Sequence, residues 1–184
     1  MSKNIYIIRH CEAKGQSADS PLTEKGFMQA KALADFLSNI KVDRIISSPF
    51  LRAIQTIRPF AEKMDLDIET DSRLTERVLS SMSFPDWLEK LETTFEDMDL
   101  KYEGGESSNE AQNRIVGVVN DILTSDSKHT LIVAHGGIIS LLLRQYDNSF
   151  GFEQWKKLSN PDVYLVRILQ KDCDIKRLWT DRSF

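Results

Sequence analysis

Short apolar runs alternate along the chain with longer segments in which apolar residues recur with a helical period. A strand covered on both faces reads as a continuous apolar stretch, so the runs that precede helical segments predict buried strands. These runs are Ile5–Ile8, Asp43–Ile46 and Thr130–Ala134. Near the carboxyl end, Val163–Leu169 and Ile175–Trp179 predict two more strands that form a hairpin or neighbouring edge strands.

Four segments carry apolar residues three and four positions apart, as on one face of an amphipathic helix. The four sets are Phe27, Ala30, Ala34 and Leu37; Ala53, Ile54, Ile57, Ala61 and Met64; Leu88, Leu91, Phe95 and Met98; and Ala111, Ile115, Val118 and Ile122. Pro21 and Thr23 mark the start of the first helix, and Ser107 with Glu110 forms a capping box before the fourth. Pro59 is expected to kink or interrupt the second helix.

Strands that alternate with helices predict an α/β fold, a three-layer α/β/α sandwich whose mostly parallel sheet is covered on both faces. No internal repeat, low-complexity tract or change of composition divides the chain. Residues 1–184 are therefore expected to form a single domain. Loops or insertions are expected at Lys14–Ser20 and Ser80–Gly105.

Composition narrows the class of protein. The 184 residues are 41% hydrophobic and 28% charged, which excludes a disordered chain, a collagen-like repeat and a disulfide scaffold. The formal net charge of −4 provides no overall basic field for nucleic acid or for an anionic membrane. Any anion site must therefore be a local cluster of Arg or His.

The location is predicted from what the sequence lacks. Apolar runs such as Gly136–Leu143 are far shorter than the ~20 residues of a membrane span, and the amino terminus does not read as a signal peptide. Cys11 and Cys173 lie far apart and have neither metal-ligand nor redox-motif spacing. These features predict a reduced, cytoplasmic protein that has no metal site and no membrane or nucleic-acid partner.

Candidate chemistry follows three of the predicted strands. Arg9 and His10 come directly after the first strand, Arg52 follows the second, and His135 precedes the glycine pair 136–137 after the third. Ligands of an open α/β sheet bind at the carboxyl ends of its strands. Guanidinium groups bind phosphate oxygens in a bidentate manner, and the N–H groups at a helix start, here that of Gly136, attract anions. The sequence therefore predicts one cationic pocket for a phosphate-like anion.

Five ordered motifs resemble the histidine phosphatase superfamily, which includes the cofactor-dependent phosphoglycerate mutases, and they run from residue 5 to about residue 140. The matching stretches are Arg9-His10-Cys11-Glu12, Leu22-Thr23 through Gln29-Ala30, Ser48 through Arg52-Ala53 to Thr56, Leu74-Thr75-Glu76 with Gly104–Ser107, and Val133-Ala134-His135-Gly136-Gly137. The resemblance implies a phosphatase that hydrolyses phosphate monoesters, with a small phosphorylated metabolite as substrate and no cofactor.

The resemblance also implies a role for each site residue. His10 would attack phosphorus and form a phosphohistidine intermediate. The phosphoryl oxygens would be bound by Arg9, Arg52 and His135. Glu76, which follows a strand-like run at 67–70, would protonate the leaving alkoxide and then deprotonate the attacking water.

Some positions depart from the family pattern. Cys11 replaces the glycine beside the nucleophile and is expected to be an inert side chain packed inward. Gln16 stands where many relatives have Asn, and its amide is expected to donate to phosphate. The residues after Glu76 lack a glycine-and-tryptophan motif, so the substrate-facing wall is not predicted. Glu106 is expected to support a loop, and Arg114 to be a surface charge on its helix.

Alternative sites are weaker. A cysteine phosphatase loop around Cys11 would need an Arg where this chain has Ser17. Two Asp-x-Asp pairs, at 65–67 and 97–99, resemble aspartate-based phosphotransferases but lie at the ends of helices. No carboxylate stands at metal-ligand spacing beside His10 or His135.

Alternative functions stay open. A mutase typically has extra segments that enclose its substrate, and this chain is short for one. A phosphatase of protein phosphohistidine has less need of an acid at Glu76, because its leaving group is a phosphoramidate nitrogen. A non-catalytic phosphate-binding module would not need the complete set of catalytic residues. The oligomeric state is not predicted by the sequence.

Overall fold

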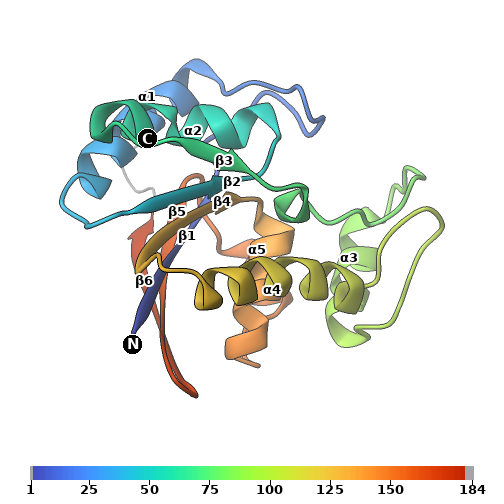
Figure 1. The fold of residues 1–184 in the computed structure, drawn as a ribbon. Helices are drawn as coiled ribbons and strands as arrows, with labels where there is room; N and C mark the ends of the chain where they lie inside the picture. The colour runs from blue at the N-terminus through green and yellow to red at the C-terminus, as the bar shows by residue number, and fades with distance from the viewer. Residues whose placement is uncertain (1, 181–184) are drawn as a thin grey trace.

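A six-stranded sheet forms the centre of the computed structural model, which describes residues 2–180 (Figure 1). Its strands are β1 (Lys3–Arg9), β2 (Arg44–Ser47), β3 (Ile68–Thr70), β4 (His129–Ala134), β5 (Asp162–Leu169) and β6 (Asp172–Thr180). They lie in the order β3-β2-β4-β1-β5-β6. The first four strands of that order pair in parallel, and β5 and β6 are antiparallel. This confirms the mostly parallel sheet and the carboxyl-terminal hairpin.

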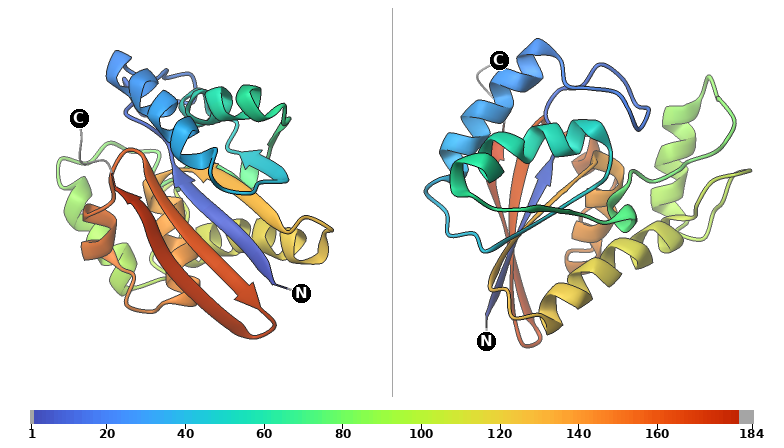
Figure 2. Two further views of the ribbon diagram at one scale, coloured as in Figure 1. Left: turned by 90° about the vertical axis from the view of Figure 1, so that its left-hand side faces the viewer. Right: turned by 45° about the horizontal axis from the view of Figure 1, so that its top comes forward.

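Helices cover both faces of the sheet (Figures 1 and 2). They are α1 (Glu24–Leu37), α2 (Leu51–Met64), α3 (Trp87–Glu96), α4 (Ser108–Thr124), α5 (Gly136–Tyr146) and α6 (Phe152–Lys156), with a 3₁₀ turn η1 (Ser72–Leu74). One core cluster joins α1 and α2 to the sheet, and a second joins α3, α4, α5 and α6 to its other face. The three-layer α/β/α architecture is therefore confirmed.

Strand β1 shows how the sheet contributes side chains to both cores. Ile5 and Ile7 belong to the cluster under α4 and α5, whereas Tyr6 and Ile8 belong to the cluster under α1 and α2. Successive side chains of a strand point to opposite faces, so a strand between two helical layers must be apolar at every position. This is the physical reason for the continuous apolar runs in the sequence.

Helix α2 runs unbroken through Pro59, so the expected interruption does not occur. Proline removes one hydrogen bond from the helix and costs ~3 kcal/mol. Ile57 and Phe60, on either side of it, are fully buried in the core and hold the helix on the sheet. Packing therefore outweighs the backbone penalty.

The apolar face of α1 is shifted from the predicted one. Phe27 is 43% exposed, whereas Leu33 is fully buried. The buried residues of α1 lie on either side of Leu37 around the helix axis, and Phe27 lies beyond them at the edge of this face.

At the start of α4 the predicted capping box is present: Ser107 Oγ accepts from the Glu110 N–H at 3.0 Å, and the Glu110 carboxylate accepts from the Ser107 N–H at 2.9 Å.

Within the described residues, no helix has the combination of length and apolar character that crossing a membrane requires.

Candidate active site

Three strands bring the predicted site residues to one edge of the sheet. In the parallel register, Arg9 of β1 pairs with Ala134 of β4, and Ser47 of β2 pairs with Val133. The residues that follow therefore leave the sheet at the same level. The His10 N–H donates to the Ala134 carbonyl at 3.1 Å, which continues the ladder by one step. His10 and His135 consequently lie side by side, with ring centroids 5.2 Å apart.

His10 is buried and neutral. Burial lowers its pKa from 6.5 to about 3; the hydrogen bond to the Cys11 carbonyl opposes this shift, and the charges of Arg9 and Arg52 add to it. Nδ1 lies 2.6 Å from the Cys11 carbonyl oxygen and must donate to it. Nε2 is then the bare nitrogen, and it accepts a hydrogen bond from Arg52 Nε at 3.3 Å. A neutral imidazole with one lone pair directed at a cationic group has the form of a nucleophile.

His135 supplies a buried donor. Burial, together with the neighbouring His10 and the charge of Arg52, lowers its pKa from 6.5 to about 2. Ser48 Oγ accepts from the Phe50 N–H at 3.2 Å and can donate its hydroxyl hydrogen to His135 Nε2, 2.8 Å away. In that tautomer the proton of the neutral ring lies on Nδ1, which has no partner among the described residues.

Arg9 and Arg52 place two guanidinium groups around His10. Arg52 is 1% exposed and donates to the Ser17 carbonyl at 2.7 Å. Arg9 donates from Nη1 to the Leu158 carbonyl at 3.2 Å, and its buried Nε has no partner within residues 2–180. Burial lowers the pKa of both groups, and the Glu76 carboxylate opposes the shift. An anionic ligand bound beside them would stabilise these buried guanidinium charges.

Gly136 allows Arg9 to approach α5. A Cβ at Gly136 would lie 3.0 Å from Nε and Cζ of the Arg9 guanidinium, so a side chain there would displace it. The backbone of the helix start and the cation therefore lie against each other, as the predicted phosphate pocket requires.

Glu76 lies at the N-terminus of α5. Its carboxylate accepts three backbone hydrogen bonds, from Arg77 at 2.7 Å, Ile138 at 2.8 Å and Gly137 at 3.0 Å. The free N–H groups and the dipole of a helix start attract negative charge. A Cβ at Gly137 would lie 2.7 Å from Glu76 Oε1, so glycine is needed for this contact.

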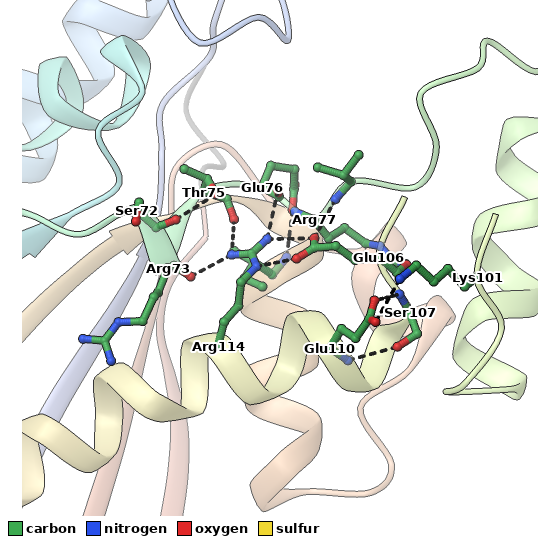
Figure 3. A network of polar contacts seen from close by, with 12 residues as sticks. Ser72, Arg73, Thr75, Glu76, Arg77, Lys101, Glu106, Ser107, Glu110 and Arg114 are labelled. Atoms are coloured by element: carbon green, nitrogen blue, oxygen red, sulfur yellow. Dashed lines mark hydrogen bonds and ion pairs between the residues drawn. The ribbon is translucent and has the colours of Figure 1, made fainter. Parts of the chain in front are cut away.

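Arg114 holds the segment that carries Glu76 (Figure 3). Its guanidinium donates to the carbonyls of Arg73 at 2.7 Å, Thr75 at 2.8 Å and Glu76 at 3.1 Å. It also forms a bidentate ion pair with Glu106, at 2.6 and 3.0 Å. The prediction of a surface charge is therefore wrong for Arg114. A signal was present in the sequence, because helical spacing places residue 114 beside the buried residues 111 and 118.

Glu106 supports the loop, as expected. Besides the pair with Arg114, its carboxylate accepts from the Val78 N–H at 2.9 Å. Hydrogen bonds from Arg114 and Val78 hold the pKa of Glu106 below its usual value, although burial is the largest single influence and acts to raise it. Cys11 is fully buried in the core cluster under α1 and α2, which agrees with an inward-packed side chain.

A cavity of about 470 Å³ opens beside these groups. Arg9, Gln16, Glu76 and Gly137 line it together, so the predicted substrate residue Gln16 lies at the same cavity as the candidate acid. The described residues contain no group of three or more His, Cys, Asp or Glu placed to hold a metal ion.

Sequence reasoning missed residues that reach the site from distant segments. Asn160 donates from its side-chain amide to the His10 carbonyl at 2.8 Å. Its neighbour Asp162 is 1% exposed and pairs with Arg177, and its charge also acts on Arg9. The Asn-Pro dipeptide at 160–161 marks a turn but does not indicate which residues that turn contacts.

Comparisons with known proteins identify the family of the chain. A family model described as the histidine phosphatase superfamily (branch 1) matches residues 5–181. Phosphoserine phosphatase 1 of Hydrogenobacter thermophilus is 28% identical over 144 residues, 70% of this chain and 68% of that protein. A probable phosphoglycerate mutase of Proteus mirabilis is 30% identical over 156 residues, 76% of this chain and 72% of that protein. The structure of a mycobacterial glucosyl-3-phosphoglycerate phosphatase has a similar fold, with a TM-score of 0.78 at 21% identity over 100% of both chains.

Proposed function

Because this chain belongs to the histidine phosphatase superfamily (branch 1), we propose that it hydrolyses phosphate monoesters of small metabolites through a phosphohistidine on His10. One observation carries the proposal. Two buried donors without a partner among the described residues, Arg9 Nε and His135 Nδ1, belong to the residues that surround the neutral His10. A phosphoryl group bound there would satisfy both donors and neutralise the buried guanidinium charge.

The first step forms the phosphoenzyme. The lone pair of His10 Nε2 attacks phosphorus, a new P–N bond forms, and the bond from phosphorus to the ester oxygen breaks. Arg9, Arg52 and His135 hold the phosphoryl oxygens and offset the charge on the transferring group. Glu76 enters this step as the carboxylic acid and gives its proton to the leaving alkoxide.

The second step restores the enzyme. The Glu76 carboxylate takes a proton from a water molecule, whose oxygen attacks phosphorus. The P–N bond breaks, inorganic phosphate forms, and His10 regains its lone pair. The same carboxyl is therefore the acid of the first step and the base of the second.

Trapping of the intermediate tests the nucleophile. We expect the phosphoenzyme to be labile in acid and stable in alkali, as a phosphoramidate is, and to be absent from the His10→Ala variant. Cys11→Ser is the matched control and should retain most of the turnover, because Cys11 packs into the core under α1 and α2. A phosphorylated sulfur, or an inactive Cys11→Ser variant with an intact fold, would contradict the assignment.

Leaving-group dependence tests Glu76. An alkoxide needs a proton donor, and general acids contribute about 10²–10⁴ in rate, whereas nitrophenolate leaves almost unaided. In single-turnover experiments, Glu76→Gln should therefore slow phosphoenzyme formation strongly with ethyl phosphate and weakly with nitrophenyl phosphate. Dephosphorylation should slow equally after either substrate. Equal effects on the phosphorylation step for both esters would rule out Glu76 as the acid.

A further inference from the structure

The cavity that Arg9 and Glu76 line is also lined by apolar residues. These are Leu79, Trp87, Leu91 and Trp155, which together form its apolar wall. Trp87 begins α3 and Trp155 belongs to α6, and their rings meet edge to face with centroids 6.5 Å apart. Leu91 is buried, whereas Trp87 is 50% exposed at the rim.

Besides Arg9, one cation, Arg77, also lines the cavity. Three of its five guanidinium hydrogens are already engaged, whereas its buried Nε has no partner within residues 2–180. Nη1 donates both of its hydrogens, to Thr94 Oγ1 at 3.1 Å and to Ser108 Oγ at 2.9 Å. Nη2 donates to the Glu106 carbonyl at 2.9 Å. The head group is therefore bound to α3, α4 and the loop before α4, and its aliphatic part lies next to Gly137. A substrate carboxylate at the apolar wall would meet apolar surface and the Glu76 carboxylate, and the buried Nε is the one nitrogen of Arg77 left without a partner among the described residues to offset them.

We propose that the alcohol part of the substrate is a flat, uncharged and largely apolar ring system that packs against Trp87 and Trp155; this rests on the proposed phosphatase function. Aromatic faces and edges favour such a ring, and the contact removes apolar surface of both partners from water. Small esters whose alcohol part carries a carboxylate, such as phosphoserine and the phosphoglycerates, are expected to be poor substrates. A carboxylate placed there would lose its hydration and could gain at most the buried Nε of Arg77 in return.

Three phosphonates that cannot be hydrolysed test the proposed role of the apolar wall directly. Their binding to the intact protein is measured by titration calorimetry. Propylphosphonate measures the phosphoryl site alone, 3-phenylpropylphosphonate adds a ring, and 4-phosphonobutanoate adds a charged carboxylate. We expect the phenyl compound to bind about tenfold more tightly than propylphosphonate, a typical gain for an aromatic contact. The carboxylate compound should bind no more tightly than propylphosphonate.

Variants separate a role in binding from a role in folding. Trp87→Ala should remove most of the phenyl advantage and leave the dissociation constant of propylphosphonate unchanged. Leu88→Ala is the matched control, because Leu88 is the next residue of α3, is 42% exposed and does not line the cavity. Trp155→Leu keeps an apolar side chain beside Phe152 and should also reduce the advantage.

Two results would overturn the proposal: tighter binding of the carboxylate compound than of the phenyl compound, or an equal effect of Trp87→Ala on propyl and phenyl binding. Turnover of 2-phenylethyl phosphate and ethyl phosphate, which share a primary alkoxide leaving group, distinguishes this failure from a failure of the proposed function. Hydrolysis of both at equal kcat/KM would contradict the ring proposal and leave the phosphatase intact. Hydrolysis of neither, with the predicted order of phosphonate binding, would support the wall and contradict the phosphatase.

Discussion

Two buried neutral imidazoles should make the stability of this protein depend on pH in a measurable way. The pKa values of His10 and His135 are lowered from 6.5 to about 3 and about 2 in the folded chain, chiefly by burial. A group whose pKa is lowered by folding stabilises the fold above its ordinary pKa. That stability is lost as the pH falls, because the unfolded chain takes up a proton that the folded chain does not.

The magnitude follows from the two shifts. One pKa unit corresponds to about 1.4 kcal/mol, and pH 5 lies about 1.5 units below the ordinary value of a histidine. Each imidazole should therefore remove about 2 kcal/mol of unfolding free energy between pH 7 and pH 5, and the pair about 4 kcal/mol. Carboxylates with lowered pKa values, such as Glu69 and Asp71, lose their contribution to stability at lower pH than this. The change in unfolding free energy between pH 7 and pH 5 therefore reports on the histidines.

Urea unfolding at pH 7, 6 and 5 measures the effect, in chloride buffers at constant ionic strength, because phosphate and sulfate would bind the cationic pocket. His10→Gln should halve the loss of unfolding free energy. His129→Gln is the matched control, because residue 129 is at the opposite end of β4 from His135. An unfolding free energy that stays flat from pH 7 to 5, or that falls equally in His10→Gln and the wild type, would show that burial does not hold His10 neutral.

Two further predictions concern residues around the nucleophile. Arg52→Gln should lower kcat by about 10²–10³ to a similar extent for ethyl and 2-phenylethyl phosphate, and a loss confined to one ester would place Arg52 in the substrate wall instead. Arg114→Met should lower kcat by about 10- to 100-fold, because the Glu76 segment loses three backbone contacts. The dissociation constant of propylphosphonate should stay unchanged, and weaker binding of it in Arg114→Met would contradict a role in positioning Glu76.

The fold was predictable wherever a single element carried its own signal. Strands buried on both faces read as apolar runs, and the capping box of α4 is a local pattern around Ser107. Helix α6 has only five residues and therefore too few turns to show a helical period. Pro59 does not interrupt α2, because the packing of Phe60 against the core outweighs the local backbone penalty, and the sequence pattern shows only that penalty.

The residues of the candidate site also differ in whether a local sequence pattern indicates them. His10, Arg52 and His135 each lie within a few residues of the end of a strand, and the parallel register brings such ends together. The contact between Asn160 and His10 joins residues 150 positions apart, so no local pattern contains it. A charged side chain such as that of Arg114 usually lies at the surface. The three carbonyl groups and the Glu106 carboxylate that it binds come from other segments and explain why this one does not.

The phosphoryl pocket and the apolar wall are built from different segments, and this has a functional consequence. The groups that we propose to bind the phosphoryl oxygens lie at strand ends and on the first turns of α2 and α5, which both cores hold in place. The apolar wall comes from α3, which lies in the segment at 80–105, and from the short helix α6. Changes at Trp87 alter what the alcohol part can contact without moving His10 or Arg52. In this chain, the chemistry and the choice of substrate are therefore carried by different segments and can change independently.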